Sequence, residues 1–227
     1  VKDIVRRLLL PLWNVYVFFI TYSTIDSWKA KTLDPKSLTI LDRWILARLD
    51  QLVWETTKDF DAYDLPAGMA KIEEFISDLS SWYIRRSRNR IGPTVGNKGE
   101  KNIFYATLHQ VLVQLWKLLA PSTPFIAEEI YRDLTGEESV HLSDWPTLSR
   151  DFKVDARVLR EMEEVRKICE LGHAKRKEER IKVRQPLAIL KVFGQRQLPE
   201  DFLTLIRDEL NVKRVVFEKP GASFSVS

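Results

Sequence analysis

Residues 75–90, FISDLSSWYIRRSRNR, change from an apolar helix face into a run of arginines. The apolar members keep the spacing of a buried helical stripe: Phe75, Ile76, Leu79, Trp82 and Tyr83. Four cations follow within a few residues, with no acidic residue among them: Arg85, Arg86, Arg88 and Arg90, the helix-end cluster. The stretch predicts a helix anchored at one end and cationic at the other. Such a helix can present charge to a polyanion, or its arginines can simply complement the helix dipole in solvent.

The arginines of the helix-end cluster do not all point the same way on a regular helix. At about 100° per residue, Arg86 continues the stripe of Leu79 and Tyr83. Arg85 and Arg88 point away from that stripe. We therefore expect Arg86 to be structural, paired with an acid of a neighbouring helix or domain, and Arg85 and Arg88 to face solvent or RNA.

Composition indicates a folded protein with a locally basic region. The chain has 227 residues, of which 44% are hydrophobic and 30% charged, and seven are Trp, which argues against disorder. Residues 1–150 hold equal numbers of basic and acidic side chains, so the net charge of +4 falls within residues 151–227. A local excess of this kind suits a patch that meets phosphate.

The only cysteine, Cys169, excludes an internal disulfide and a cysteine-rich zinc site. It lies on an apolar helical stripe, and we expect a buried thiol in a reduced, cytoplasmic protein. The apolar run at residues 8–20 is interrupted by Pro11 and is too short to span a bilayer. We expect a buried core helix there and no membrane contact. The chain lacks an initiating Met, and we expect it to be a fragment of a longer protein.

Periodicity predicts a mainly α protein with a small mixed α/β appendage. The expected helices span residues 2–23, 40–60, 65–89, 101–119, 124–134 and 155–179. Residues 181–193 and 212–217 have the spacing of strands, with a short helix between them at 198–210 and a further strand possible at 224–226. We expect a helical-bundle domain at 1–179 and a small β-α-β domain at 180–227.

No enzyme motif is present. The sequence lacks a glycine-rich phosphate loop, a G-x-S-x-G turn and an H-E-x-x-H helix, and its histidines, His109, His141 and His173, are far apart. We expect no catalytic residue and no metal site. A second basic group stands out instead: Lys175, Arg176, Arg180, Lys182 and Arg184, the junction cluster. Both clusters are candidates for contacts with the RNA backbone, and Trp28, Tyr131 and Trp145 could stack on bases or pack locally.

Several segments resemble, in order, the C-terminal region of the isoleucyl-tRNA synthetases, in the form found in archaea and eukaryotes. They are LLLPLWNVYVFFITYSTIDSW (8–28), LDRWILARLDQLV (41–53), DLSSWYIRRSRNR (78–90), LLAPSTPFIAEEIY (118–131), SVHLSDWP (139–146), IKVRQPLAILKV (181–192) and ELNVK (209–213). The LDRWIL-like and LAPxTPFxxEE elements also resemble the valine and leucine enzymes. KVRQPL and ELNVK favour isoleucine.

The resemblance implies a class I synthetase whose helical bundle binds the anticodon stem-loop of tRNA-Ile. It also implies ATP and Mg²⁺ in the parent enzyme and none in this part, because the HIGH and KMSKS signatures are absent here. The expected partners are tRNA-Ile and the enzyme's own catalytic domain, with no oligomer indicated. Two alternatives stay open: the same region of a valyl- or leucyl-tRNA synthetase, and a non-enzymatic helical scaffold that binds an acidic protein.

Overall fold

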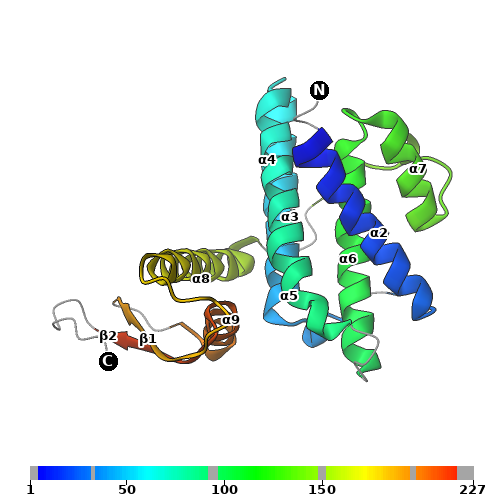
Figure 1. The fold of residues 1–227 in the computed structure, drawn as a ribbon. Coiled ribbons are helices and arrows are strands. Elements are labelled where there is room, and N and C mark those ends of the chain that lie inside the picture. Colours follow the sequence, from blue (N-terminus) through cyan, green and yellow to red (C-terminus); the bar gives the residue numbers. More distant parts are fainter. Residues whose placement is uncertain (1–4, 32–33, 92–96, 148–151, 195–197, 219–227) are drawn as a thin grey trace. The chain divides into compact units, whose positions relative to one another are not determined.

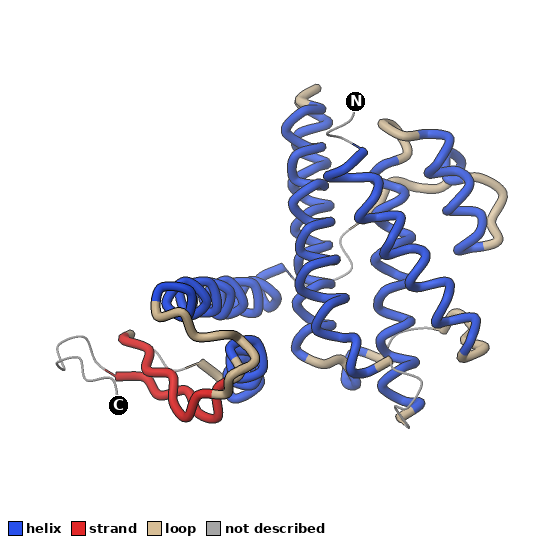
Figure 2. Tube along the Cα trace, in the orientation of Figure 1, coloured by secondary structure: helices blue, strands red, loops and turns tan. Residues whose placement is uncertain are grey.

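The computed structural model describes residues 5–31, 34–91, 97–147, 152–194 and 198–218 (Figure 1). The chain forms two compact units, Val1–Asp155 (unit 1) and Ala156–Ser227 (unit 2). Unit 1 is helical, and the strands belong to unit 2 (Figure 2). The prediction of a mainly helical protein with a small α/β part is confirmed. The division differs from the predicted boundary after residue 179, because the last predicted helix of the bundle packs within unit 2.

Within the residues that the structure describes, unit 1 contains five long helices. They are α2 (Leu10–Ile25), α3 (Ile40–Asp61), α4 (Leu65–Asp78), α6 (Lys98–Leu119) and α7 (Pro124–Thr135). Short turns complete it: η1 (Val5–Leu9), η2 (Pro35–Ser37), η3 (Leu79–Ile84), α5 (Arg85–Ser87), η4 (Arg88–Arg90) and η5 (Val140–Leu142). Helices α3 and α4 pack along each other after a short turn, and α6 packs against α2, α3 and α7. This is the predicted helical bundle.

Side-chain caps are present at the starts of α3 and α4 but not at the start of α7. Thr39 begins α3 with a capping box, in which its hydroxyl accepts from the Asp42 backbone N–H and its own N–H donates to Asp42. Asp64 accepts from the Ala67 N–H at the start of α4. Thr123 precedes α7 without a side-chain cap, since its hydroxyl instead donates to the Leu119 carbonyl. These caps satisfy N–H groups that have no partner inside the helix.

Aromatic side chains from several helices form the core of unit 1. Trp44 of α3, Phe75 of α4, Tyr83 of η3 and the α6 residues Phe104 and Trp116 are all fully buried. The rings of Tyr83 and Phe104 stack with centroids 5.5 Å apart. Each such ring removes a large apolar area from water, which makes this core the main stabilising term of the bundle.

Helix α2 is only partly buried, which differs from the predicted core helix. Leu12, Val15 and Phe19 face the core, whereas the opposite side carries Leu10 and Trp13, which are 49% and 46% exposed. Val5–Ile25 is long and apolar enough to cross a bilayer by length and composition, but a single such helix is weak evidence of a span. Pro11 lies in the first turn of α2, where its missing N–H costs nothing, and a π-helical turn precedes it.

The stretch after α4 does not continue as a regular helix. Residues Leu79–Ile84 form a π-helical segment, and the last arginines form a short 3₁₀ turn. A π-helical segment widens the helix and shifts the direction of every later side chain. The buried positions from here to the end of the stretch are Leu79, Tyr83, Ile84, Ser87 and Ile91.

Unit 2 contains α8 (Phe152–Glu178) from Ala156 onward, together with β1 (Leu187–Phe193), α9 (Glu200–Leu210) and β2 (Val212–Glu218). The two strands are parallel, with Leu187 opposite Val212. The predicted first strand is shorter than expected, because residues 182–185 form a turn before it. The possible strand at 224–226 lies outside the described residues.

Close packing ties α8 to α9 inside unit 2. A Cβ added at Gly172 of α8 would lie 2.4 Å from a methyl group of Leu210, so glycine permits this approach. His173 lies 3.2 Å from the carboxylate of Glu209, and Cys169 is buried as predicted. These contacts join α8 to α9 within unit 2.

Candidate nucleic-acid interface

The helix-end cluster divides into exposed and buried arginines. Arg85 and Arg88 are exposed, and the Arg85 Nε donates to the Ser81 carbonyl over 2.8 Å. Arg86 is half-buried, with its guanidinium 5.8 Å from the Trp82 ring centre. The exposure of Arg85 and Arg88 and the partial burial of Arg86 agree with the expected directions, although the π-helical segment intervenes.

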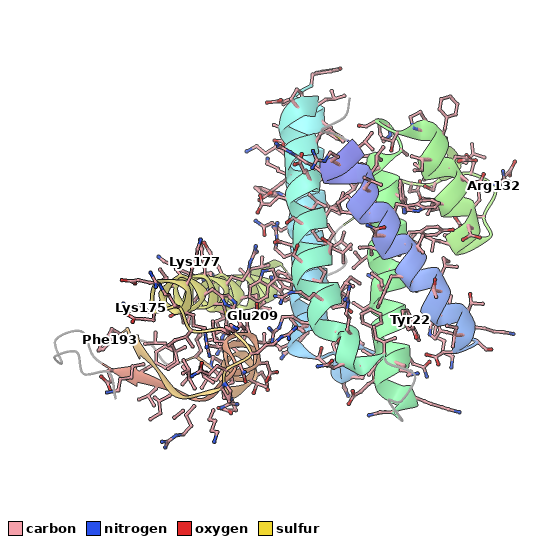
Figure 3. All side chains as sticks on the ribbon, viewed as in Figure 1. Tyr22, Arg132, Lys175, Lys177, Phe193 and Glu209 are labelled. Carbon is pink, nitrogen blue, oxygen red and sulfur yellow. The ribbon has the colours of Figure 1, made fainter. Side chains whose placement is uncertain are left out.

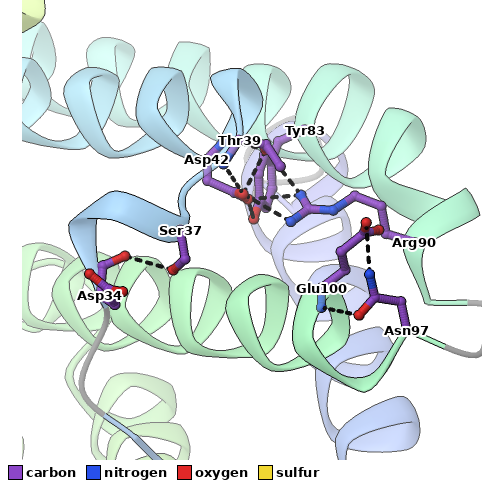
Figure 4. A network of polar contacts seen from close by, with 8 residues as sticks. All are labelled: Asp34, Ser37, Thr39, Asp42, Tyr83, Arg90, Asn97 and Glu100. Carbon is purple, nitrogen blue, oxygen red and sulfur yellow. Dashed lines mark hydrogen bonds and ion pairs between the residues drawn. The ribbon is translucent and has the colours of Figure 1, made fainter.

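The Arg90 side chain is mostly buried in unit 1 and forms an ion pair there. Its two terminal nitrogens each donate to the Asp42 carboxylate over 2.9 Å, a bidentate ion pair (Figure 4). Thr39 and Tyr83 also donate to that carboxylate through their hydroxyls, over 2.6 and 2.7 Å. The Arg90 side chain is 13% exposed and that of Asp42 is 0% exposed. The charge of Arg90 is therefore balanced inside the protein, and its role is to fix the end of the arginine segment.

The same network sets the ionisation of its members. Burial opposes the charge of Asp42, but the hydrogen bonds and positive charge of Arg90 outweigh it and lower the pKa of the carboxyl. Burial and the neighbouring Asp42 carboxylate raise the pKa of Tyr83 well above its usual value. Asp42 is therefore ionised and Tyr83 neutral at physiological pH. The ion pair spans α3 and η4, which lie far apart in sequence.

A cavity of about 300 Å³ lies beside the exposed end of the cluster. Its walls are Phe18 and Tyr22 of α2 together with Arg88 and Ile91. The rings of Phe18 and Tyr22 are 4.8 Å apart between centroids and inclined at 49°. Aromatic rings beside a guanidinium provide a stacking surface for a base and a cation for a phosphate. The cavity therefore combines two aromatic rings with one cation.

Polar contacts hold the aromatic wall of this cavity in place. Tyr22 lies near the C-terminal end of α2 (Figure 3), where Asp26 follows the helix. The Asp26 carboxylate accepts from the Lys101 ammonium over 3.0 Å and from the Tyr105 hydroxyl over 2.6 Å, both on α6. The hydrogen bond from Tyr105 and the charge of Lys101 lower the pKa of Asp26 against the opposing effect of burial. The end of α2 is thereby fixed to α6.

The junction cluster contains one buried member. Arg176 is 4% exposed, and its guanidinium donates to the carbonyls of Lys182, Gln185, Leu210 and Asn211. Arg180, Lys182 and Arg184 are exposed. Lys175 is also exposed on α8 (Figure 3), but its ammonium lies 3.0 Å from both Glu178 and Glu179. The two clusters lie in different units.

The three aromatic residues suggested by sequence as stacking platforms pack locally. Trp28 lies against Phe19 and Tyr105, with ring centres 5.8 and 6.0 Å apart. The Trp145 indole donates to the Thr57 hydroxyl over 2.8 Å, and the buried Tyr131 donates to the Glu137 carboxylate. Phe18 and Tyr22, which line the cavity, are not among the residues predicted from the sequence. Their spacing of four residues beside the buried stripe of α2 is the signal that could have found them.

The residues described here do not assemble a catalytic group or metal site. His109 has its Nε2 2.9 Å from the Leu134 carbonyl and packs beside Phe19, which is a structural arrangement. Within the described ranges, no three or more His, Cys, Asp or Glu side chains are grouped so as to hold a metal ion. The side chains that the two clusters and the cavity present are cationic and aromatic.

Comparison with known proteins identifies relatives of this chain. It is 42% identical over 99% of its length to the isoleucine–tRNA ligase of Protochlamydia amoebophila, of which it covers 22%. The isoleucine–tRNA ligases of Dehalococcoides mccartyi and Deinococcus radiodurans are 40% and 41% identical, and the chain covers 23% and 20% of them. The chain thus spans about a fifth of these relatives' length. All three are bacterial, so they do not single out the archaeal and eukaryotic form.

A family model described as the anticodon-binding domain of tRNA ligase matches residues 42–192. The match includes the helix-end cluster of unit 1 and the junction cluster of unit 2. It covers more than half of the sequence, and the chain therefore belongs to the family of anticodon-binding domains of tRNA ligases.

Proposed function

We propose that this chain is the part of an isoleucine–tRNA ligase that binds the anticodon stem-loop of tRNA-Ile. The observation that carries the proposal is the cavity formed by Phe18, Tyr22, Arg88 and Ile91 at the end of the helix-end cluster. A base of the loop would stack on the aromatic rings, and Arg88 would bind a neighbouring phosphate. The relatives that are isoleucine–tRNA ligases, and the family of the chain, support the choice of RNA.

The proposed contact residues are the exposed members of the two clusters. Arg85 and Arg88 act in unit 1, and Arg180, Lys182 and Arg184 act in unit 2, each toward the sugar–phosphate backbone. Lys175 contributes less, because two glutamates already neutralise it. Arg90 and Arg176 support the interface from inside and do not touch RNA, since their terminal guanidinium nitrogens donate to groups within the protein. Arg86 helps to orient the segment through its contact with Trp82.

The longer enzyme would couple isoleucine to tRNA-Ile with ATP and Mg²⁺, as the class I synthetases do. This chain would bind and orient the tRNA for the catalytic domain, without a cofactor of its own and without bond-making. We place the enzyme in the cytoplasm, where its tRNA is found, and away from membranes. The segments quoted from the sequence support the archaeal and eukaryotic form. The sequence identity of this chain to isoleucine enzymes from archaea, eukaryotes and bacteria tests the assignment to that form. Equal identity to all three groups would contradict the assignment.

A matched pair of substitutions tests the proposed cavity. Phe18→Leu keeps an apolar side chain but removes the stacking ring, whereas Phe125→Leu changes a ring that is 92% exposed at the start of α7. Stacking of one base contributes about 1–3 kcal/mol, so Phe18→Leu should weaken binding of a tRNA-Ile transcript roughly 5- to 150-fold. Phe125→Leu should leave the affinity unchanged. Equal affinities of the two variants at the same salt concentration would contradict a nucleotide in this cavity.

Competition experiments separate the remaining alternatives. An unlabelled tRNA-Ile transcript should displace labelled tRNA-Ile more effectively than valine or leucine transcripts do. A synthetic acidic peptide at equal salt tests the helical-scaffold alternative. Preference for the peptide, or for a valine or leucine tRNA, would replace the isoleucine assignment by the corresponding one.

A further inference from the structure

The turn at residues 182–185 has an unusual backbone arrangement. Its four successive carbonyl oxygens accept hydrogen bonds from only two side chains. The Arg176 guanidinium donates to Lys182 and Gln185, and the Asn211 amide donates to Val183 and Arg184, all over 3.1 Å. The Gln185 N–H also donates to the Lys182 carbonyl over 3.0 Å, which closes the turn. The carbonyl side of the turn therefore faces the protein.

The two side chains that hold this turn are themselves fixed. Arg176 is buried and also donates to the Leu210 carbonyl over 2.7 Å, at the end of α9. Asn211 ends α9 in the left-handed conformation, with φ of 48°, and its N–H bonds to the Arg207 carbonyl. Asn is one of the few side chains that tolerate this conformation. The turn is thus pinned to the ends of both helices of unit 2.

This arrangement leaves two cations on the outer side of the turn, beside the exposed Val183 and Gln185. Carbonyl oxygens repel a phosphate, and here they point to Arg176 and Asn211 instead of outward. The side chains of Lys182 and Arg184 are exposed on the turn. Because the backbone is already ordered, binding an anion costs less conformational entropy than ordering a flexible loop would.

Arg180, two residues before the turn, has a strained backbone conformation. Arg180 lies two residues after the end of α8 and has a φ of 56°, a left-handed conformation that glycine adopts without strain. The Ile181 N–H bonds back to the Arg176 carbonyl over 2.8 Å, the pattern of a helix end at which glycine is common. An exposed arginine here keeps a cation next to the turn at the expense of backbone strain.

We propose that residues 180–185 form a preformed phosphate-binding loop that contacts the sugar–phosphate backbone of tRNA. This inference rests on the proposed function, since it takes tRNA as the ligand. Arg180, Lys182 and Arg184 make the contacts, and Arg176 and Asn211 are positioning residues that hold the loop from inside. The sequence predicted Arg176 as an RNA contact because of its charge; in this proposal it supports the loop from inside instead.

Three variants of the full chain test the loop with an unmodified tRNA-Ile transcript. Lys182→Ala/Arg184→Ala removes two cations and should flatten the plot of log affinity against log salt by roughly 0.7–0.9 for each lost phosphate contact. Arg180→Gly removes a cation and relieves strain, so binding should weaken while the unfolding midpoint stays equal or rises. Asn211→Gly keeps the left-handed helix end but removes both hydrogen bonds to the turn. It should weaken binding about three- to tenfold, the effect of one or two hydrogen bonds.

A double-mutant comparison separates positioning from general stability. Asn211→Gly should have no further effect on affinity in the Lys182→Ala/Arg184→Ala background, because the cations that it positions are gone. An equal loss in both backgrounds would overturn the positioning role. Unchanged affinity and salt dependence for Arg180→Gly and for the double variant would overturn the loop as a phosphate site. If Phe18→Leu still weakens binding in that case, the proposed function stands without the loop, whereas a wild-type chain that binds no tRNA refutes the proposed function itself.

Discussion

Replacing Asp42 by Asn should destabilise unit 1 strongly, although the two side chains have nearly the same shape. In the protein, the Asp42 carboxylate accepts from both terminal nitrogens of Arg90, from Thr39 and from Tyr83. An amide in its place carries no charge and turns an N–H₂ donor toward groups that are themselves donors. The substitution therefore leaves the Arg90 guanidinium without a counter-charge in a mostly buried site.

The magnitude follows from the burial of the two partners. Removing one partner of a buried ion pair costs about 3–5 kcal/mol of unfolding free energy. The Asp42 side chain is 0% exposed and that of Arg90 is 13% exposed, so some hydration of the guanidinium remains. We therefore expect the lower end, about 3 kcal/mol, for Asp42→Asn. Arg90→Met should lower the unfolding free energy by a similar amount. The double variant should lose less than the sum of the two single losses, by about 1 kcal/mol or more, because side chains in contact are coupled by energies of this size.

Unfolding in urea, followed by tryptophan fluorescence, measures this effect in unit 1 alone. All seven tryptophans lie before residue 156, so the signal excludes unit 2. The pKa of Asp42 is lowered in the folded state, so its stabilisation is complete above its unfolded pKa of about 3.9 and is lost as pH falls through the lower folded value. The difference between wild type and Asp42→Asn should therefore be largest at pH 7 and shrink below about pH 4.

Two outcomes would contradict a stabilising role of the Asp42–Arg90 ion pair. One is a loss of less than about 1 kcal/mol at pH 7, the range of a surface ion pair. The other is strict additivity of Asp42→Asn and Arg90→Met, because it would mean that the two side chains do not interact.

Two further substitutions test packing in each unit. Gly172→Ala in α8 places a methyl group 2.4 Å from Leu210, so it should lower the unfolding free energy by about 1–3 kcal/mol. Circular dichroism should show a lower thermal midpoint. An unchanged midpoint would contradict the close approach of α8 and α9. Tyr105→Phe removes the hydroxyl that donates to Asp26 over 2.6 Å, and should lower the unfolding free energy of unit 1 by about 1.5–3 kcal/mol, the contribution of a hydrogen bond to a charged group. A fluorescence-monitored urea midpoint equal to wild type would show that this contact does not secure the end of α2.

The helices and the fold class could be predicted from sequence because their signals are local. The apolar period of Phe75, Leu79 and Tyr83 and the Thr39 capping box each involve residues a few positions apart. The position of α8 could not be predicted in the same way. Its apolar stripe shows that one face is buried, but the choice of α9 as its neighbour depends on Gly172 meeting Leu210, 38 positions later in the chain.

The functional assignment of individual arginines depends on contacts that charge patterns do not contain. Arg90 and Arg88 look alike in the sequence, yet Arg90 pairs with Asp42 of α3, 48 residues away, and Arg88 lines a cavity. Arg176 lies in a basic run but bonds to carbonyls from two other segments. The π-helical segment at Leu79–Ile84 also changes side-chain directions without a clear sequence signal. Exposure of cations is therefore decided by tertiary structure.

The most direct test of the account is the salt dependence of tRNA-Ile binding for Arg85→Ala/Arg88→Ala and for Arg132→Ala, a control arginine on α7. The first variant should bind more weakly and lose roughly 0.7–0.9 in the slope of log affinity against log salt for each phosphate contact. The control should match wild type in both affinity and slope. An affinity and slope equal to wild type for Arg85→Ala/Arg88→Ala would contradict the claim that this end of unit 1 binds RNA.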